Sequence, residues 1–482
     1  MPKQYRADNI VCMQTHTATV LHLRGAAGMD AIYRKISWRL LPLLMLCYAV
    51  ASLDRINLGY AQGRMQASLA FGDQVYAWGA GLFFAGCCLF ALPANLLLEK
   101  AGARRSLLRL MLGWGVASAA TAFVRTPFQL YALRFALGAF EAGFFPGVIL
   151  YLCWWYPAAR RARAFAVFAS AALLAGVAAG PLCDATLAAL QGVAGLQGWQ
   201  WLLLSQGLPA VLLGAVVYCC LDERPDDAGW LSPFEQLMVE QDLERDEAQL
   251  RAALAPGQPA PDDAAPPASS TGDIIASLLR DRALCLLAAA NLLLIGASYA
   301  LLSWAPALMQ RWAEASHMQP GLLAAVPSLA GMAGMIAIGH DSDRRRERRG
   351  HFVACMVLAA GGLALALAAN DGMAWSLAGL ALASLGIASA APLLIAIVTD
   401  LLSRQRAPAG IALVLGFGLL GGAFAPVLSA RLLAWGGSAA MLAVLIAMYL
   451  AAGAILLLAL RLAPRHGGPD ARHGSSDKMA RN

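Results

Sequence analysis

Long apolar segments run through most of the chain and limit its possible folds more than any other feature. About twelve of them reach the roughly 20 residues that an α-helix needs to cross a membrane. Only 13% of the residues are charged and 59% are hydrophobic, whereas soluble domains carry about 25% charged residues. This composition excludes a water-soluble globule and predicts an all-α integral membrane protein with twelve transmembrane helices.

The predicted helices form two groups of six. They cover about 38–60, 75–98, 106–124, 128–152, 162–188 and 199–221 in the first group, and about 283–309, 319–340, 351–369, 373–400, 409–431 and 437–461 in the second. A charged motif that follows the second helix, Glu99-Lys100-x-Gly-x-Arg104-Arg105, is echoed after the eighth as Asp343-Arg344-x-x-x-Arg348-Arg349. We therefore predict two six-helix bundles related as parallel repeats, with a substrate site at their interface near the middle of the membrane.

Five regions follow from this pattern. They are an N-terminal tail (1–36), a first bundle (37–221), a linker (222–282), a second bundle (283–461) and a C-terminal tail (462–482). A short helix is expected to begin at Ser232-Pro233-Phe234-Glu235, which combines an N-cap serine, a proline at the first helical position and a glutamate at N3. Residues 255–272 are rich in Pro, Ala, Asp and Ser and are predicted to be a flexible linker.

Basic residues cluster in every second loop between the apolar segments. The clusters are Arg104 and Arg105; Arg160, Arg161 and Arg163; Arg344, Arg345, Arg346, Arg348 and Arg349; and Arg404 with Arg406. The positive-inside rule places these loops and both termini in the cytoplasm. Residues 1–30 lack a cleavable signal pattern, and Met29, just before a basic stretch, is a candidate start of translation.

Composition and motifs give no sign of nucleic-acid binding, a bound cofactor or catalysis. The net charge of +7 is spread over several loops, and the ten cysteines show neither CxxC pairs nor metal-ligand spacing. No nucleophile occurs in a recognisable setting, and a Gly-rich phosphate loop and an HExxH motif are absent from the sequence. We expect no cofactor, no enzymatic activity and a monomeric protein.

Four charged residues lie within the first and fourth predicted helices: Asp54, Arg55, Arg134 and Glu141. Such charges cost about 3 kcal/mol each on insertion scales and therefore indicate function. Two guanidinium groups facing one cavity form a receptor for a carboxylate. Burial and a nearby guanidinium act in opposite directions on a carboxyl group, which makes Asp54 and Glu141 candidates for proton exchange near neutral pH. The alternative is that the four residues form structural ion pairs.

Other polar residues extend this candidate site. The substrate-binding candidates are Arg55, Arg134, Asn57, Tyr48, Asn291 and Tyr299, and the proton-coupling candidates are Asp54 and Glu141. For Asn291 and Tyr299 the alternative role is helix packing. The candidates for gating are Glu99, Arg104, Arg105, Asp343 and Arg344, which lie at membrane ends. There, acid–base pairs across the bundle interface would latch one conformational state, and the alternative is a solvated basic loop.

Longer motifs, within a similarity that covers about 30–461, resemble one known family. They include Leu53-Asp54-Arg55-Ile56-Asn57, the run from Asn95 to Arg105, and the run from Arg134 through Glu141 to Pro146. They resemble the major facilitator superfamily, specifically the anion:cation symporters that carry phthalate, tartrate, hexuronate and 4-hydroxyphenylacetate. The resemblance implies proton-driven uptake of a small organic anion by alternating access. It assigns substrate binding to Arg55 and Arg134 and proton coupling to Asp54 and Glu141.

The chain departs from that family at several positions of the expected cavity wall. Apolar or small residues stand where relatives commonly carry polar or bulky ones, namely at Cys87, Ala91, Ala94, Ile395, Val398, Leu415 and Leu419. A site that loses hydrogen-bond donors no longer favours hydroxylated ligands. We expect a substrate less hydroxylated than tartrate, aromatic or aliphatic. An exporter driven by proton antiport and a receptor that binds an anion without transport remain as alternatives.

Overall fold

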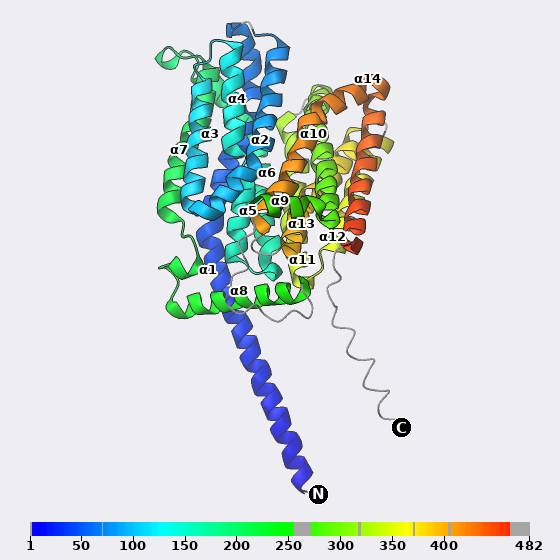
Figure 1. Cartoon of the computed structure of the whole chain (residues 1–482). Coiled ribbons are helices and arrows are strands. Elements are labelled where there is room, and N and C mark those ends of the chain that lie inside the picture. The colour runs from blue at the N-terminus through cyan, green and yellow to red at the C-terminus, as the bar shows by residue number, and fades with distance from the viewer. Residues whose placement is uncertain are drawn as a thin grey trace.

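The computed structural model describes residues 2–69, 71–254, 271–316, 320–369, 372–402 and 406–462, and within these ranges it contains helices and no strands. Two bundles of long helices stand side by side (Figure 1). The first contains α1 (Pro2–Leu69), α2 (Asp73–Ala101), α3 (Ala103–Thr121), α4 (Pro127–Glu141), α5 (Phe144–Trp155), α6 (Ala158–Ala189) and α7 (Gly198–Cys220). The second contains α10 (Arg282–Ser316), α11 (Pro320–Arg345), α12 (Arg349–Ala368), α13 (Met373–Leu401) and α14 (Ala407–Leu462).

Each of the twelve predicted helices is found, but the boundaries differ in three places. The helix predicted at 128–152 is divided into α4 and α5 around Ala142 and Gly143, just before Pro146, which is accommodated in the first turn of α5. The helices predicted at 409–431 and 437–461 are joined in α14, which breaks at Gly436 and Gly437. Gly437 has φ 65°, a conformation that glycine adopts without strain. Helix α1 begins at Pro2, far ahead of the predicted residue 38.

Eleven helical segments of the described chain are long and apolar enough to cross a membrane. Helix α3 is not among them because its 19 residues include Arg104, Arg105 and Arg109. It nevertheless packs against its neighbours through a buried face that contains Trp114 and Ser118. The structure therefore confirms the all-helical, multi-pass membrane architecture.

The linker contains a short 3₁₀ turn, Pro225–Asp227, and two helices, α8 (Pro233–Leu254) and α9 (Thr271–Arg280). A second 3₁₀ turn, Val193–Gly195, lies between α6 and α7. The predicted capping box at the start of α8 is confirmed, since the N–H of Glu235 donates to Oγ of Ser232 at 3.2 Å and the N–H of Ser232 donates to the Glu235 carboxylate at 2.8 Å. A hydrogen bond from Lys35 is the main cause that lowers the pKa of Glu235. Residues 255–270 of the predicted flexible linker lie outside the described residues.

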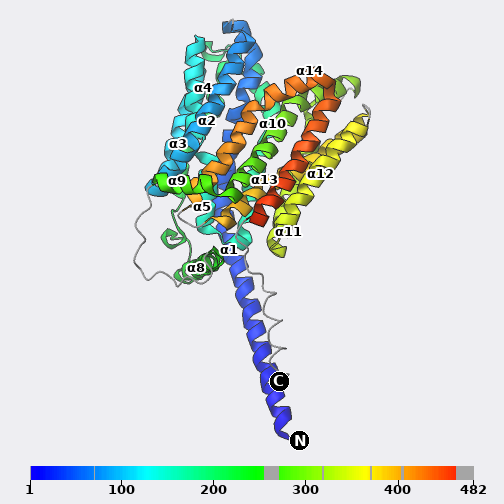
Figure 2. The same cartoon turned by 45° about the vertical axis from the view of Figure 1, so that its right-hand side comes forward.

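Helix α8 lies across one end of the bundles (Figures 1 and 2). Its Asp242 accepts a hydrogen bond from the hydroxyl of Tyr33 in α1 at 2.9 Å. Its Asp246 accepts one from the N–H of Ala158 at 3.0 Å and pairs with Arg161 of α6 at 3.3 Å. The linker is thereby attached to the first bundle by polar contacts at Tyr33 of α1 and at the start of α6.

Candidate functional site

Arg55 and Glu141 form an ion pair between α1 and α4. Nε of Arg55 donates to Oε1 of Glu141 at 3.0 Å, and one terminal guanidinium nitrogen contacts the same oxygen. The Glu141 side chain is only 2% exposed, whereas that of Arg55 is 24% exposed. Oε2 of Glu141 is buried and has no hydrogen-bond partner in the described part of the chain. The pair therefore has an accessible cationic partner and a buried, half-satisfied carboxylate.

Asp54 has different partners from those expected. Its Oδ1 accepts hydrogen bonds from the hydroxyl of Ser118 in α3 at 2.7 Å and from the amide of Asn57 at 3.1 Å. Asp54 and Asn57 are each 1% exposed, and Oδ2 of Asp54 has no partner among the described residues. The Asn57 amide, predicted as a substrate-binding group, thus donates its hydrogen bond to Asp54. Ser118 was not singled out from the sequence, because a serine in an apolar helix gives no signal of its own.

Arg134 is buried in α4 without a carboxylate partner. It is 6% exposed, and within the described residues no hydrogen bond or ion pair to its guanidinium is found. The guanidinium lies over the ring of Phe83 in α2, 5.3 Å from the centroid. A Cβ atom at Gly79 would lie 3.6 Å from its Cγ, an ordinary van der Waals distance, so α2 packs directly against the stem of the arginine. Arg134 lies close enough to Glu141 and Asp54 to interact with their charges, but it forms an ion pair with neither of them. It remains a candidate for binding an anion.

Aromatic side chains surround Arg55. Tyr48 of α1 and Tyr299 of α10 both lie close enough to Arg55 to interact with its charge. The Tyr48 ring packs on Phe145 and Phe168 with centroid distances of 5.1 and 4.9 Å. The Tyr299 ring meets Phe84 of α2 edge-on at 5.8 Å, a contact between the two bundles. The structure thus brings Tyr48 and Tyr299 to the charged cluster, from opposite bundles.

Asn291 has a structural contact instead. Its amide donates to the carbonyl oxygen of Val414 at 2.8 Å and joins α10 to α14 within the second bundle. A Cβ at Gly418 would lie 2.3 Å from the same amide nitrogen, so the helices approach closely there. The helix-packing alternative considered for this residue matches its contacts.

Several positions at which the chain departs from the family that it resembles form apolar walls. Cys87 and Ala91 of α2 belong to a cluster with Phe83 and Leu137, against which Leu419 of α14 packs. Ile395 and Val398 are buried at 5% and 2% exposure. The side chains that α2 and α14 contribute to this wall are therefore apolar and offer few hydrogen-bonding groups.

The gating candidates behave differently in the two bundles. Asp343 of α11 accepts hydrogen bonds from the backbone N–H groups of Arg163, at 2.7 Å, and Ala162, at 3.3 Å, near the start of α6. This contact joins the bundles. Arg348 adds to it by pairing with Asp343 at 3.5 Å and with Asp400 of α13 at 2.9 Å.

The matching motif of the first bundle has different contacts. Arg104 donates to the carbonyl oxygen of Tyr218 at 2.9 and 2.6 Å, within its own bundle. The N–H groups of Ala103 and Arg104 donate to Glu223 at 2.7 and 3.1 Å, which caps α3. Glu99, Arg105 and Arg344 are exposed at the membrane ends. Glu223 and Asp400 were not found from the sequence, since each is one acidic residue near a helix end.

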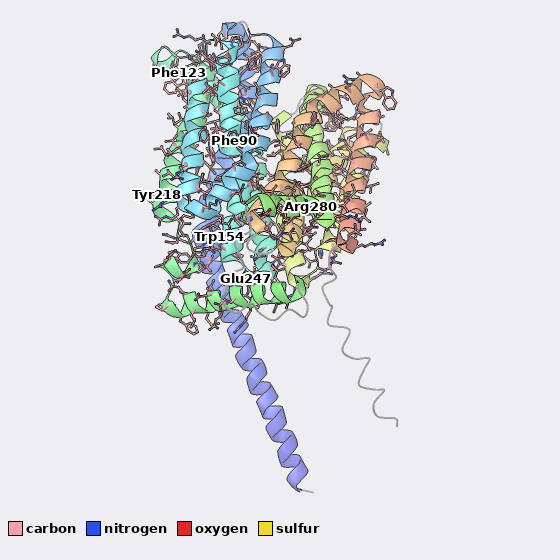
Figure 3. All side chains as sticks on the ribbon, viewed as in Figure 1. Phe90, Phe123, Trp154, Tyr218, Glu247 and Arg280 are labelled. Carbon is pink, nitrogen blue, oxygen red and sulfur yellow. The ribbon has the colours of Figure 1, made fainter. Side chains whose placement is uncertain are left out.

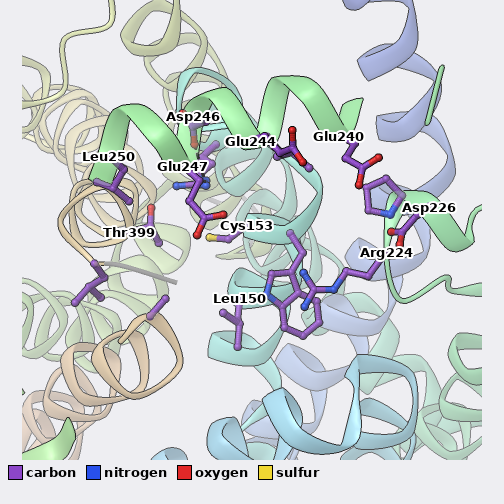
Figure 4. A pocket seen from close by; sticks show the side chains of 16 residues that line it. Leu150, Cys153, Arg224, Asp226, Glu240, Glu244, Asp246, Glu247, Leu250 and Thr399 are labelled. Carbon is purple, nitrogen blue, oxygen red and sulfur yellow. Dashed lines mark hydrogen bonds and ion pairs between the residues drawn. The ribbon is translucent and has the colours of Figure 1, made fainter. Parts of the chain in front are cut away.

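A cavity of about 370 Å³ lies between α8 and the ends of α5 and α13 (Figure 4). Carboxylates of α8, among them Glu244 and Glu247, line it together with Cys153 and Thr399. Its lining includes none of the four buried charged residues. We therefore place the candidate substrate site at the charges and treat this cavity as part of the linker contact.

Comparisons with known proteins identify the family of the chain. The family model described as Major Facilitator Superfamily matches residues 44–388 and, in a second overlapping match, 312–478. A protein of Agrobacterium vitis named as a tartrate transporter is 39% identical over 441 residues, which are 91% of this chain and 96% of that protein. A protein of Pseudomonas putida named as metabolite transport protein NicT is 36% identical over 401 residues, 83% and 88% of the two chains.

Among solved structures, the proton:xylose symporter XylE bound to 6-bromo-6-deoxy-D-glucose has a similar fold. The TM-score is 0.65 at 13% identity, over 87% of this chain and 94% of that one. The family match covers well over half of the chain, and the relatives align over most of their own length. The chain is therefore a multi-pass membrane transporter that belongs to the major facilitator superfamily.

Proposed function

We propose that this transporter imports a small organic carboxylate together with protons by alternating access. The observation that carries the proposal is Arg134, which is buried, forms no hydrogen bond or ion pair within the described residues, and lies close enough to Glu141 and Asp54 to interact with their charges. Its guanidinium donors are therefore free to bind a substrate carboxylate beside Arg55. In this proposal the face that carries α8 is cytoplasmic in a bacterial inner membrane, and the protein works as a monomer.

The ion pair suggests how protons would couple to transport. When a substrate carboxylate takes the place of Glu141 beside Arg55, Glu141 is left as a buried charge without a partner. Its protonation removes that cost, because a neutral carboxyl group is far less expensive to bury than a carboxylate. Substrate and proton then enter together, and loss of the proton returns Glu141 to Arg55 and expels the substrate. Asp54, linked to α3 through Ser118, is proposed as a second protonation site.

The walls favour a poorly hydroxylated substrate. Phe145, Phe168 and Phe84 pack around the two tyrosines that flank Arg55. These rings suit the flat, apolar face of an aromatic carboxylate. Tartrate, by contrast, would bring two hydroxyl groups that need hydrogen-bond partners. We propose that an aromatic acid such as phthalate is preferred to tartrate.

Flux measurements in proteoliposomes test the function. Purified protein is reconstituted, and accumulation of labelled phthalate is followed with an acidic outside, with an acidic inside and without a gradient. We expect accumulation inside only when the outside is acidic, and weaker accumulation of tartrate. Extrusion of the substrate driven by an inward proton gradient would identify a proton-antiport exporter instead. Binding detected by thermal shift with no flux in either direction would favour a receptor.

Opening at the α8 face should depend on Asp343. We expect Asp343→Asn to weaken the contact with the start of α6, because a neutral amide accepts hydrogen bonds less strongly than a carboxylate. The variant should populate the state open at this face several times more than the wild type does, as read from spin-label distances between α6 and α11. Asp341→Asn is the control, since Asp341 pairs with Arg345 and His351 of its own bundle. Equal distance distributions for both variants would remove Asp343 from gating.

A further inference from the structure

A second cavity, of about 450 Å³, opens at the ends of α2, α3 and α7, on the side of the first bundle from which the linker departs. Its lining includes four cations against two carboxylates: Lys100, Arg104, Arg105 and Arg224, with Glu99 and Glu223. The excess of positive charge at this cavity is not used by the transport mechanism proposed above.

The cations of this cavity are only partly compensated. Glu223 is engaged by the backbone N–H groups that begin α3. Lys100 and Arg105 are exposed, and in the described part of the chain neither side chain has a hydrogen-bond or ion-pair partner. The guanidinium of Arg104 lies 5.3 Å from the centroid of the Tyr218 ring. The cavity therefore offers several donors to an anionic group from one side.

The surroundings of the cavity are those of a lipid-facing surface. Tyr218 lies at the outer edge of the first bundle (Figure 3). Leu208, Leu212 and Val216 of α7 are 50%, 68% and 41% exposed, and their spacing of four residues places them in one stripe along the helix. The stripe runs toward the end of α7 at which Tyr218 lies. Tyrosine is common at the level of lipid headgroups. Acyl chains would cover this stripe, whereas a water-soluble anion would gain nothing from it.

We infer that this cavity binds the phosphate headgroup of an anionic phospholipid, with the acyl chains along the exposed stripe of α7. Arg105 and Lys100 contact the phosphate, and the Tyr218 ring lies beside the glycerol region. Basic pockets at membrane-facing helix ends are a known way of selecting anionic lipids. The site would make the first bundle sensitive to the charge of the surrounding membrane, independently of which substrate is carried.

Lipid selectivity of the full chain tests the inference. Purified protein is reconstituted with spin-labelled phosphatidylglycerol or spin-labelled phosphatidylcholine, and the relative association constants are measured. The wild type should prefer phosphatidylglycerol, and the preference should fall by about fivefold for each cation removed. We therefore expect about a 25-fold loss in Lys100→Gln/Arg105→Gln. Arg346→Gln/Arg349→Gln removes the same charge from the second bundle and should leave the preference unchanged.

Two further arms separate the sources of the phosphate and guard against misfolding. Arg105→Lys keeps the charge and should keep most of the preference. Soluble sn-glycerol 3-phosphate should not displace the labelled lipid, because it lacks acyl chains. Displacement by glycerol phosphate, or the same preference in the wild type and in the Lys100/Arg105 double variant, would overturn the inference. Loss of the preference in the Arg346/Arg349 control would also overturn the inference, because it would show that the preference depends on the total surface charge and not on this cavity.

Discussion

Replacing Arg55 with alanine is expected to lower the initial rate of carboxylate uptake by about a hundredfold or more. The variant loses one of two guanidinium groups that would bind the substrate, and truncating one partner of a buried charge pair costs about 2–5 kcal/mol in binding. It also leaves Glu141 without its ion-pair partner, so the proposed exchange of Glu141 and substrate at Arg55, and with it the coupling to the pH gradient, is lost. Uptake by proteoliposomes under an imposed gradient measures the effect.

Two companion variants separate transport from folding. Removing one member of a buried ion pair destabilises a protein by about 3–5 kcal/mol, so a lower melting temperature alone would not demonstrate a role in binding. Arg55→Ala/Glu141→Ala removes both charges, and it should regain most of the stability but none of the transport. Arg125→Ala changes an exposed arginine of the α3–α4 loop and should behave as wild type. Near-normal uptake by Arg55→Ala would show that the pair is only structural.

The sequence predicts the architecture well because membrane insertion depends on a property visible in short windows. The apolar segments predict all twelve helices. They include α3, although its three arginines make it too charged to count among the eleven candidate membrane spans. Helix breaks are less visible. The division between α4 and α5 places Glu141 at the very end of α4, and only the nearby Pro146 hints at it. Boundaries at such breaks depend on how neighbouring helices pack, which one segment does not encode.

The candidate site is only partly predictable for a related reason. The spacing of Arg134 and Glu141 places both on one face of a helix, but it cannot show how that helix is rotated against α1. The structure therefore pairs Arg55 with Glu141, while Asp54 turns to Ser118. The Asn291 amide is used by the carbonyl oxygen of Val414. Contacts between distant helices decide these partners, and the sequence lists only the candidates.

The repeated charged motif at the bundle ends is a further case in which the sequence predicts local structure but not the contacts between distant helices. A glutamate caps the third helix of each bundle, Glu223 for α3 and Glu347 for α12. Although partial burial acts to raise it, hydrogen bonds from Gly350 and His351 hold the pKa of Glu347 below its usual value. Asp343 and Arg348 of the second motif then both contact the start of α6, while Arg104 of the first motif is held by Tyr218. The repeat in sequence predicts similar local caps, and the asymmetric linker gives the two motifs different surroundings.

Glu141→Gln is expected to abolish accumulation driven by a pH gradient and to leave exchange of labelled for unlabelled substrate. Glutamine keeps the shape and can still accept a hydrogen bond from Arg55, so the site should persist. It cannot take up or release a proton, so no energy from the gradient reaches the substrate. One pH unit supplies about 1.4 kcal/mol per proton, or roughly tenfold accumulation, and the variant should show none of it.

The comparison of two assays on the same vesicles makes this prediction specific. A variant that is merely unfolded loses both accumulation and exchange, whereas a variant that has lost its protonation site loses only the first. Glu244→Gln, on the exposed side of α8, is the control and should retain both. If Glu141→Gln still accumulates substrate tenfold per pH unit, the proton is carried elsewhere, and Asp54 becomes the next residue to replace. If exchange is also lost in a folded variant, the carboxylate of Glu141 is needed to hold Arg55 in place, because a neutral amide cannot keep the guanidinium charge buried at this depth.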